Sequence, residues 1–316
     1  MGWLNYREVM LMPFKYYGGV HPDEMKQPTL ATSYIAQPPQ VVIPLQMHIG
    51  APCQPLVKVG DTVTMGQKIG DNPAPLCAPI HATVSGKVVA IEPRRHCVIG
   101  DMVPSIVIEN DGLDTPCTDL APLTEQQLKD PDAILERIRE GGVVGMGGAM
   151  FPTHFKIQGG RGKVDTLIIN GAECEPYLNG DHRTMLEHPE ELLKGIELVR
   201  IAQGVDKAYY GIEENKQDAI DLLNSLNPEK YGVVIVPEKV KYPQGAEKMQ
   251  VKANTNREVK PGGIPSGVGC NVVSTFTCWS VYRACYEGRP LIERVLSVGG
   301  SAIKPANVMV RFGTPI

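Results

Sequence analysis

The hydrophobic pattern of this chain changes its period once, and that change limits the possible folds most strongly. Between Val41 and about Asn110, short runs of alternating apolar and polar residues are separated by Gly-Asp, Gly-Gln and Ser-Gly turns, a pattern typical of short strands. From about Thr124 onward, segments with apolar residues at helical spacing alternate with short apolar runs. Strands that alternate with such helices pair in parallel. The sequence therefore predicts an all-β domain at 41–115 and an open α/β domain at 120–290.

Individual elements can be placed from the same pattern. A capping box formed by Thr124 and Gln127 predicts a helix that ends at Gly141–Gly142. Residues 1–40 are rich in proline, glycine and polar residues, and predict an extended N-terminal arm. The segment 291–316 is expected to begin a further β-rich domain. Within the α/β domain we expect helices at 189–204, 215–226 and 275–286, and strands at 167–169, 208–212 and 233–236.

Composition excludes several classes of protein. The 316 residues carry a formal net charge of −4 and no long run of Lys or Arg, which argues against a nucleic-acid partner. No segment approaches the ~20 uncharged apolar residues of a membrane span, and the N-terminus lacks the apolar core of a signal peptide. A cytoplasmic location without direct membrane insertion is expected. The eight cysteines include no C-x2-C pair, so we expect reduced thiols and no metal site.

Two glycine-containing half-motifs in the β domain resemble the halves of the biotinyl/lipoyl-type barrel-sandwich hybrid. They lie at 57–70 (VKVGDTVTMGQKIG) and at 82–88 (ATVSGKV). A carrier domain of this type presents a lysine at the tip of the hairpin between its halves, whereas the connection 71–80 contains none. Lys68 precedes this connection and is expected to be an ordinary exposed strand residue. The domain is therefore interpreted as a scaffold and not as a carrier.

Three segments of the α/β domain have the composition of ligand-binding loops. The first, Gly145–Lys156, contains glycines that let backbone N–H groups approach a phosphate or a flat aromatic ligand. The second, Ile168–Tyr177, follows an apolar strand and places Asn170 and two glutamates where open α/β sheets bind ligands. The third, Tyr242–Lys248, has a glycine ahead of a helix, a geometry suited to anions. Each pattern is also common in ordinary turns, so none is specific alone.

Taken together in this order, the three segments (GMGGAMFPTHFK, LIINGAECEPY and YPQGAEK) resemble the RnfC family. The resemblance also includes GGVHPDEMK, VVIPLQMHIGAP, GIEENKQDAI and ERVLSVGG, and covers nearly the whole chain. It implies a Rossmann-like FMN-binding domain, similar to that of the flavoprotein subunit of respiratory complex I. In such a module NADH gives a hydride to FMN, which passes single electrons to iron–sulfur clusters. The resemblance implies that no residue acts as a catalytic acid or base. It also implies that the following residues contact the cofactor: Gly145, Gly147, Gly148, Lys156, Asn170, Glu173, Glu175, Gly245 and Thr277.

This chain departs from the usual family pattern in several places. Met150 and His154 stand where smaller residues are usual, and Ser274–Thr277 (STFT) replaces the usual Asn-Val-Gly-Thr. Bulkier side chains, Phe276 among them, are expected to crowd the slot in which flavin and nicotinamide stack. The chain stops at Ile316, where RnfC proteins continue into a β-rich domain and two cysteine-rich motifs. Any [4Fe-4S] clusters are therefore expected only in a C-terminal part that this sequence lacks.

The resemblance also implies partners and a location. The expected partners are the other subunits of a membrane electron-transport complex and ferredoxin or a similar acceptor, with the chain peripheral on the inner face of the cell membrane. Two alternatives stay open. One is a related flavoprotein that feeds another reductase, of the proline or cobalamin type. The other is a non-catalytic assembly subunit that keeps the fold without flavin.

Overall fold

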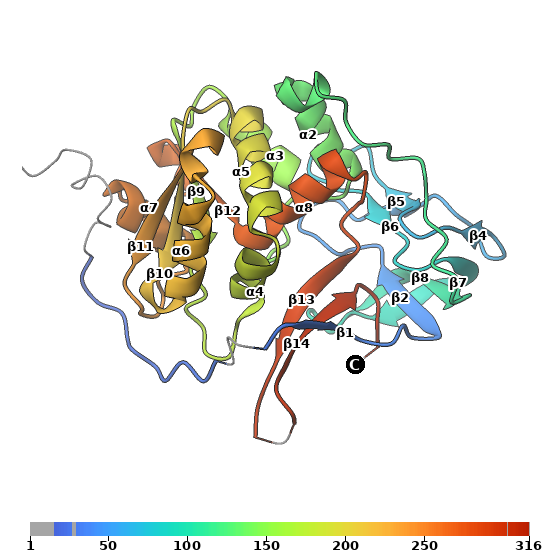
Figure 1. Cartoon of the computed structure of the whole chain (residues 1–316). Helices are drawn as coiled ribbons and strands as arrows, with labels where there is room; N and C mark the ends of the chain where they lie inside the picture. The colour runs from blue at the N-terminus through green and yellow to red at the C-terminus, as the bar shows by residue number, and fades with distance from the viewer. Residues whose placement is uncertain (1–15, 27–29, 302, 316) are drawn as a thin grey trace, which may run out of the picture.

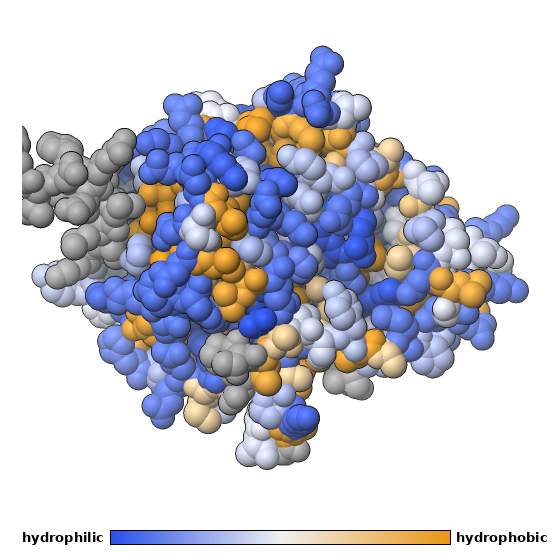
Figure 2. Space-filling model, viewed as in Figure 1, coloured by the Kyte–Doolittle hydropathy of each residue, from blue (hydrophilic) through white to orange (hydrophobic). Residues whose placement is uncertain are grey.

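The computed structural model describes residues 16–26, 30–301 and 303–315. Figure 1 shows an α/β domain beside a smaller β domain. Residues 1–15 of the expected N-terminal arm lie outside the described residues. Among the described helices, none combines the length and the apolar character required to cross a bilayer. Figure 2 shows that this side of the molecule is largely hydrophilic, with apolar residues in separate groups.

The β domain consists of two small antiparallel sheets around one apolar core. Alternate residues of a strand point to the same face, and accordingly Val41, Ile43, Ile106 and Ile108 are fully buried in this core. One sheet has the order β2-β8-β7-β4 and the other the order β3-β5-β6. The strands are β2 (Gln40–Pro44), β3 (Gln54–Pro55), β4 (Thr62–Val63), β5 (Lys68–Asp71), β6 (Ile80–His81), β7 (Gly86–Arg95) and β8 (Met102–Asn110).

The α/β domain is built on a four-stranded parallel sheet with the order β11-β10-β9-β12. Its strands are β9 (Thr166–Gly171), β10 (Ala208–Glu213), β11 (Val233–Glu238) and β12 (Cys270–Ser274). Helices cover both faces, because Leu167 and Ile169 pack into the main core whereas Ile168 packs with Val251 in a second, smaller one. This arrangement confirms the predicted open α/β fold. The helices are α2 (Pro131–Glu140), α3 (Thr153–Gly160), α4 (Gly180–Glu187), α5 (Pro189–Gln203), α6 (Gln217–Ser225), α7 (Glu247–Thr255) and α8 (Thr275–Tyr286).

A third sheet brings together segments from near the two ends of the described chain. Strand β1 (Thr32–Tyr34) pairs in parallel with β14 (Ala306–Arg311), which pairs in antiparallel fashion with β13 (Glu293–Val298). In Figure 1 these strands lie low in the view, between the β domain and the helices of the α/β domain. The described part of the N-terminal arm therefore contributes a strand to the segment that follows the α/β domain.

The alternating pattern of the β domain also predicts a strand at Leu56–Val59, but these residues form bends and a turn instead. The carboxylate of Asp61 accepts a hydrogen bond from the Lys58 N–H at 2.9 Å, which closes this turn. Local side-chain bonding of this kind competes with strand pairing. The prediction of a strand at these residues is wrong for that reason.

The helix predicted from Thr124 is divided in two. The Thr124–Gln127 capping box is present, with the Gln127 N–H bonded to the Thr124 hydroxyl at 3.3 Å, but it starts only the short 3-10 helix η1 (Gln127–Lys129). Helix α2 begins separately at Pro131, because the Asp130 carboxylate accepts a hydrogen bond from the Asp132 N–H at 2.9 Å. Aspartate before a helix-initiating proline is a strong start signal of its own.

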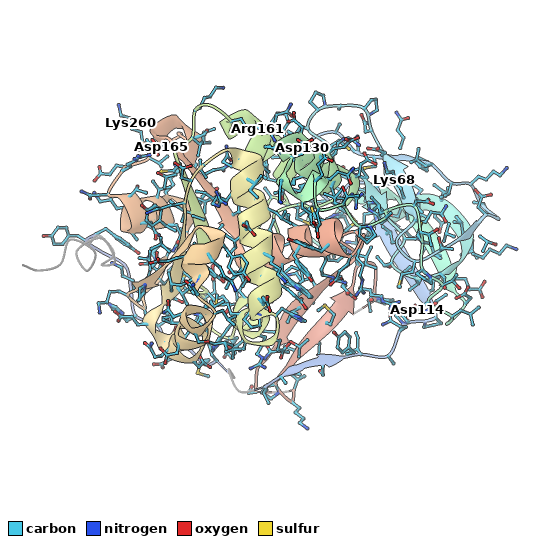
Figure 3. All side chains as sticks on the ribbon, turned by 45° about the horizontal axis from the view of Figure 1, so that its top comes forward. Lys68, Asp114, Asp130, Arg161, Asp165 and Lys260 are labelled. Atoms are coloured by element: carbon cyan, nitrogen blue, oxygen red, sulfur yellow. The ribbon has the colours of Figure 1, made fainter. Side chains whose placement is uncertain are left out.

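Lys68 is not the exposed strand residue that its position predicted. Its ammonium group forms ion pairs with Glu140 of α2 and, at 3.5 Å, with Asp71. Arg139, also from α2, binds the Asp71 carboxylate at 2.9 Å. Figure 3 labels Lys68 on the side of the β domain that faces the helices. These ion pairs connect the β domain to α2. Lys68 is partly buried because it lies between the two domains.

Candidate cofactor-binding site

A cavity opens at the carboxyl edge of the parallel sheet. From β9 the chain continues to β10 and β11 on one side, whereas β12 lies on the other side of β9. Open α/β sheets bind ligands at such a reversal, outside the carboxyl ends of the strands. The cavity has a volume of about 770 Å³ and is lined by all three segments that the sequence indicated. Its size suits a small organic ligand.

The loop Gly145–Gly148, between α2 and α3, forms one wall of this cavity. The Gly145 N–H donates a hydrogen bond to the Phe151 carbonyl oxygen at 2.9 Å, which closes the loop. A methyl group added at Gly147 or Gly148 would meet no heavy atom within 4 Å, so the backbone there faces open space. Gly148 has a φ of +141°, which L side chains rarely adopt. At Gly147 and Gly148 the wall is therefore bare backbone that a ligand can approach closely.

Three helix N-termini meet at the same cavity. Helix α3 begins at Thr153, α7 at Glu247 and α8 just after Ser274, and all three of these residues line the cavity. The first turns of α3 and α8 contain no acidic side chain. The unpaired N–H groups of a first turn and the helix dipole favour bound anions. This arrangement suits the phosphate groups of a nucleotide.

Lys156 places a positive charge at the cavity. Its ammonium group donates hydrogen bonds to the Glu247 carboxylate at 2.6 Å and to the Val272 carbonyl oxygen at 2.9 Å. These contacts hold the side chain between α3, α7 and β12. An ammonium group has three N–H donors, so Lys156 has capacity to bind an anionic ligand as well.

Asn170, Cys174 and Gly245 join the second segment to the third. The Asn170 amide donates a hydrogen bond to the Gly245 carbonyl oxygen at 2.8 Å, and its oxygen accepts one from the Ala172 N–H at 3.1 Å. The Gly245 N–H donates to the Cys174 sulfur at 3.2 Å. A Cβ at position 245 would lie 2.5 Å from the Ala172 carbonyl oxygen, so this approach requires glycine. Burial raises the pKa of the Cys174 thiol to about 11, which keeps it neutral.

Glu173 and Glu175 differ in what they line. Glu175 lines both the large cavity and a smaller neighbouring one, whereas Glu173 lines only the smaller one, together with Lys26 of the arm. The Glu173 carboxylate accepts hydrogen bonds from the N–H groups of Asp181 at 2.8 Å and His182 at 3.0 Å, at the start of α4. Eight of the nine residues selected from the sequence therefore line the large cavity: Gly145, Gly147, Gly148, Lys156, Asn170, Glu175, Gly245 and Thr277.

Of the three bulky departures from the family pattern, Met150 alone lines the cavity. His154 is directed to the β domain, where its Nε2 lies 3.4 Å from the Pro75 carbonyl oxygen. Phe276 is buried in the main core, and its ring packs edge-on against Trp279 with 5.1 Å between ring centroids. The expectation that His154 and Phe276 crowd the slot is therefore wrong.

Some cavity residues were not selected from the sequence. Ser274 and Thr153 line the cavity at helix starts, and Lys163 also lines it. The Ser274 hydroxyl lies 2.8 Å from the Thr277 hydroxyl, across the first turn of α8. A serine directly before a predicted helix is an N-cap signal and could have identified Ser274. Thr153 and Lys163 carry no comparable signal.

Comparisons with known proteins agree with this geometry. The family described as RnfC barrel sandwich hybrid domain matches residues 14–113, and the Nuo51 FMN-binding domain family matches residues 138–283. The chain is 41% identical over 304 residues to the C subunit of the Na(+)-translocating ferredoxin:NAD(+) oxidoreductase complex of Acetobacterium woodii, covering 95% of this chain and 68% of that protein. The chain belongs to the RnfC family.

Other RnfC proteins and one solved structure extend the comparison. The C subunit of the proton-translocating ferredoxin:NAD(+) oxidoreductase complex of Clostridium ljungdahlii is 43% identical, covering 96% of this chain and 67% of that protein. The C subunit of the ion-translocating oxidoreductase complex of Klebsiella pneumoniae is 37% identical, but this chain spans only 40% of its length. The NAD+-reducing [NiFe]-hydrogenase in the H2-reduced state is similar in fold, with a TM-score of 0.53 and 24% identity over 62% of this chain and 40% of that one.

Proposed function

We propose that this chain is the flavin-binding electron-transfer module of an Rnf-type complex, and that it moves electrons between NADH and iron–sulfur clusters or ferredoxin through FMN. One observation carries the proposal. The bare backbone of Gly147 and Gly148 and the N-termini of α3 and α8 face one cavity, at the point where the strand order reverses. A flat ring fits against a wall without side chains, and a phosphate fits a helix N-terminus.

The residues at the cavity have different proposed roles. Gly147 and Gly148 leave room for the flavin ring, while Lys156 and the first turn of α8 bind its phosphate. Glu175, at the rim, accepts hydrogen bonds from the ribose hydroxyls of NADH. Bound FMN supplies the exchange between hydride transfer and single-electron transfer, so the surrounding residues need only bind and orient.

The names of the relatives support a proposal about partners. The Acetobacterium, Clostridium and Klebsiella relatives are named as subunits of ion-translocating oxidoreductase complexes. We propose that this chain likewise assembles with membrane subunits, on the cytoplasmic side, and that ferredoxin or a similar protein exchanges electrons with the complex. The [4Fe-4S] clusters of the route are assigned to parts outside this sequence.

The test compares FMN with riboflavin, which lacks the phosphate. We expect FMN to bind the purified chain about tenfold or more tightly than riboflavin, because the phosphate makes charge-assisted hydrogen bonds. Quenching of flavin fluorescence measures both affinities. Under anaerobic conditions, added NADH is expected to bleach the bound flavin. A chain that takes up no FMN would instead be a non-catalytic assembly subunit, and a bound flavin that NADH leaves unbleached would contradict the NADH step alone.

A further inference from the structure

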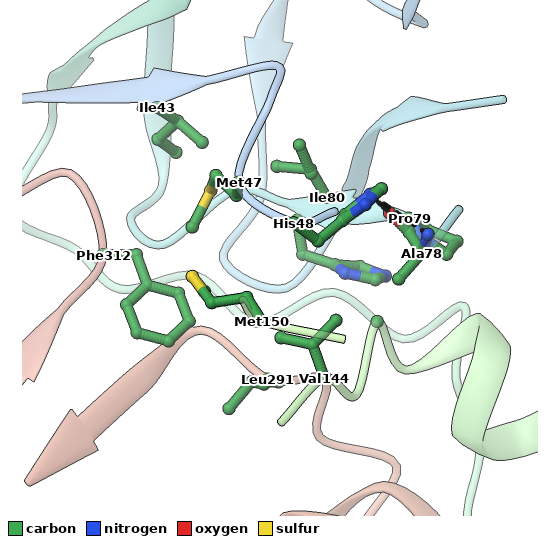
Figure 4. Close-up of a pocket in the computed structure, with 12 residues that line it drawn as sticks. Ile43, Met47, His48, Ala78, Pro79, Ile80, Val144, Met150, Leu291 and Phe312 are labelled. Carbon is green, nitrogen blue, oxygen red and sulfur yellow. Dashed lines mark hydrogen bonds between the residues drawn. The ribbon is translucent and has the colours of Figure 1, made fainter. Parts of the chain in front are cut away.

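Three side chains of metal-binding types meet inside the β domain, away from the cavity described above. His48, Cys53 and Cys77 are all buried, and their Nε2 and Sγ atoms lie close together. His48 and Cys53 come from the loop between β2 and β3, and Cys77 comes from the loop between β5 and β6. Figure 4 shows His48 and Ala78 in the wall of a small cavity between the two domains.

The distances among the three ligand atoms match the edges of a tetrahedral metal site. The two sulfur atoms are 3.6 Å apart, and His48 Nε2 lies 3.7 Å from Cys77 Sγ and 3.9 Å from Cys53 Sγ. Tetrahedral zinc with Zn–S and Zn–N bonds of ordinary length requires edges of about 3.8 Å between sulfurs and about 3.5 Å between sulfur and nitrogen. The three atoms therefore need little movement to hold an ion.

A fourth donor completes the tetrahedron. The Ala78 carbonyl oxygen lies 3.0 Å from His48 Nε2, 3.3 Å from Cys53 Sγ and 3.8 Å from Cys77 Sγ. All six edges of the four-atom group therefore fall between 3.0 and 3.9 Å. This oxygen, or a water molecule in its place, can occupy the fourth position of the site.

The His48 ring has the outer contact of a metal ligand. Its Nδ1 lies 3.1 Å from the Ile49 carbonyl oxygen. A proton on Nδ1 that is donated to this oxygen leaves the lone pair on Nε2 directed to the sulfurs, as in most histidine metal ligands. The Ala78 N–H donates to Nε2 at 3.1 Å, so a bound ion would replace this hydrogen bond.

We propose that His48, Cys53 and Cys77 bind a thiophilic divalent cation of the zinc class. Both thiols release their protons to solvent when the ion binds. The ion would join the loop of residues 45–53 to the loop of residues 72–79. Next to it, the Ile49 N–H donates a hydrogen bond to the Ala149 carbonyl oxygen at 3.0 Å. The site would therefore also support the glycine loop that forms a wall of the large cavity.

Metal analysis of the purified chain tests this proposal. The chain is produced without a polyhistidine tag, in medium supplied with zinc and without added flavin, and its zinc is measured by mass spectrometry. We expect about one zinc ion per chain, lost in Cys53→Ala and Cys77→Ala. Cys97→Ala is the matched control, because Cys97 is exposed and outside the cluster, and this variant should keep its zinc.

X-ray absorption at the zinc edge of the unmodified chain covers the case in which the cysteine variants do not fold. Two sulfur ligands, with nitrogen or oxygen in the remaining positions, are the expected result. Zinc without sulfur ligands, zinc retained equally by all variants, or an unmodified chain that takes up no zinc would each overturn the proposal. So would an intact mass that is lower by two hydrogen atoms, which would show a disulfide between the two cysteines.

Discussion

The buried carboxylate of Glu238 accepts a hydrogen bond from the side-chain amide of Gln244, 2.8 Å away, behind the third segment of the candidate site. The amides of Gln250 and Asn254 donate to the same carboxylate, at 2.6 and 2.7 Å. Burial nevertheless raises the pKa of Glu238 to about 7, because it outweighs these hydrogen bonds. A carboxyl group at the end of β11 therefore titrates near neutral pH, beside the loop that carries Gly245.

The stability of the fold should depend on this group. With a pKa of about 7 when folded and 4.5 as its ordinary value, Glu238 keeps its proton in the folded chain while the unfolded chain releases it. The free energy of unfolding therefore falls as the pH rises from about 4.5 to about 7, and stays lowered above that range. Relative to Glu238→Gln, the unmodified chain should lose on the order of 2–3 kcal/mol over this window.

Urea unfolding of both chains at about pH 4.5 and about pH 8 measures this difference. Asp181, whose pKa burial and the neighbouring Glu173 also raise to about 7, is present in both chains and cancels in the comparison. Two chains whose stabilities change in parallel would show that Glu238 is not the titrating group.

Gly147→Leu should weaken flavin binding without unfolding the chain. The position faces open space inside the cavity, so the added side chain occupies the place of a ligand and clashes with nothing else. We expect FMN affinity to fall about tenfold or more, with an unchanged thermal midpoint. Gly267→Leu is the control, because Gly267 also faces open space but does not line the cavity. Equal FMN affinity in both variants would contradict the assignment of this wall.

Asn170→Leu should weaken both the fold and the site. It removes the hydrogen bonds to the Gly245 carbonyl oxygen and the Ala172 N–H, and should cost about 1–3 kcal/mol of unfolding free energy. FMN affinity should fall too, because the third segment loses its attachment to the second. Asn224→Leu, on the exposed face of α6, is the control for stability. An Asn170→Leu chain that binds FMN normally would show that this contact does not position the loop.

Glu173→Ala should change stability but not flavin binding. Its carboxylate accepts hydrogen bonds from the first N–H groups of α4, and loss of such a cap typically costs about 1 kcal/mol. Glu173→Gln keeps an accepting oxygen and should restore part of this stability. The same FMN titration separates the two possible roles of Glu173. A loss of affinity as large as that of Gly147→Leu would mean that Glu173 contacts the cofactor after all.

The sequence predicts those parts of the fold that are determined by residues close together along the chain. Leu167 and Ile169 enter one core and Ile168 enters the other, because successive side chains of a strand point to opposite faces. Asn170 could be placed at the cavity because it follows that strand in an open α/β sheet. The position of Phe276 could not be predicted in the same way. A family motif gives the usual residue at a position, but it does not determine whether a different side chain there points into the cavity or into the core.

The cluster of His48, Cys53 and Cys77 could not be predicted from spacing. The two cysteines are 24 positions apart and come from separate loops, whereas known zinc patterns depend on short, regular intervals. The two loops approach because β3, directly after Cys53, pairs with β5, which leads into the loop that carries Cys77. Similarly, the different roles of Glu173 and Glu175 could not be predicted, because they depend on where α4 begins in the folded chain.

The pairing of β1 with β14 has a consequence for the order in which this protein is made. The Ser33 hydroxyl donates a hydrogen bond to the Asn307 carbonyl oxygen, 274 positions later. During translation Ser33 leaves the ribosome long before its partner has been synthesised, so the third sheet cannot form until both domains have emerged. Contacts so distant in sequence close slowly. The arm therefore has no strand partner until Ala306–Arg311 has been synthesised, and the formation of the third sheet is a late step of folding.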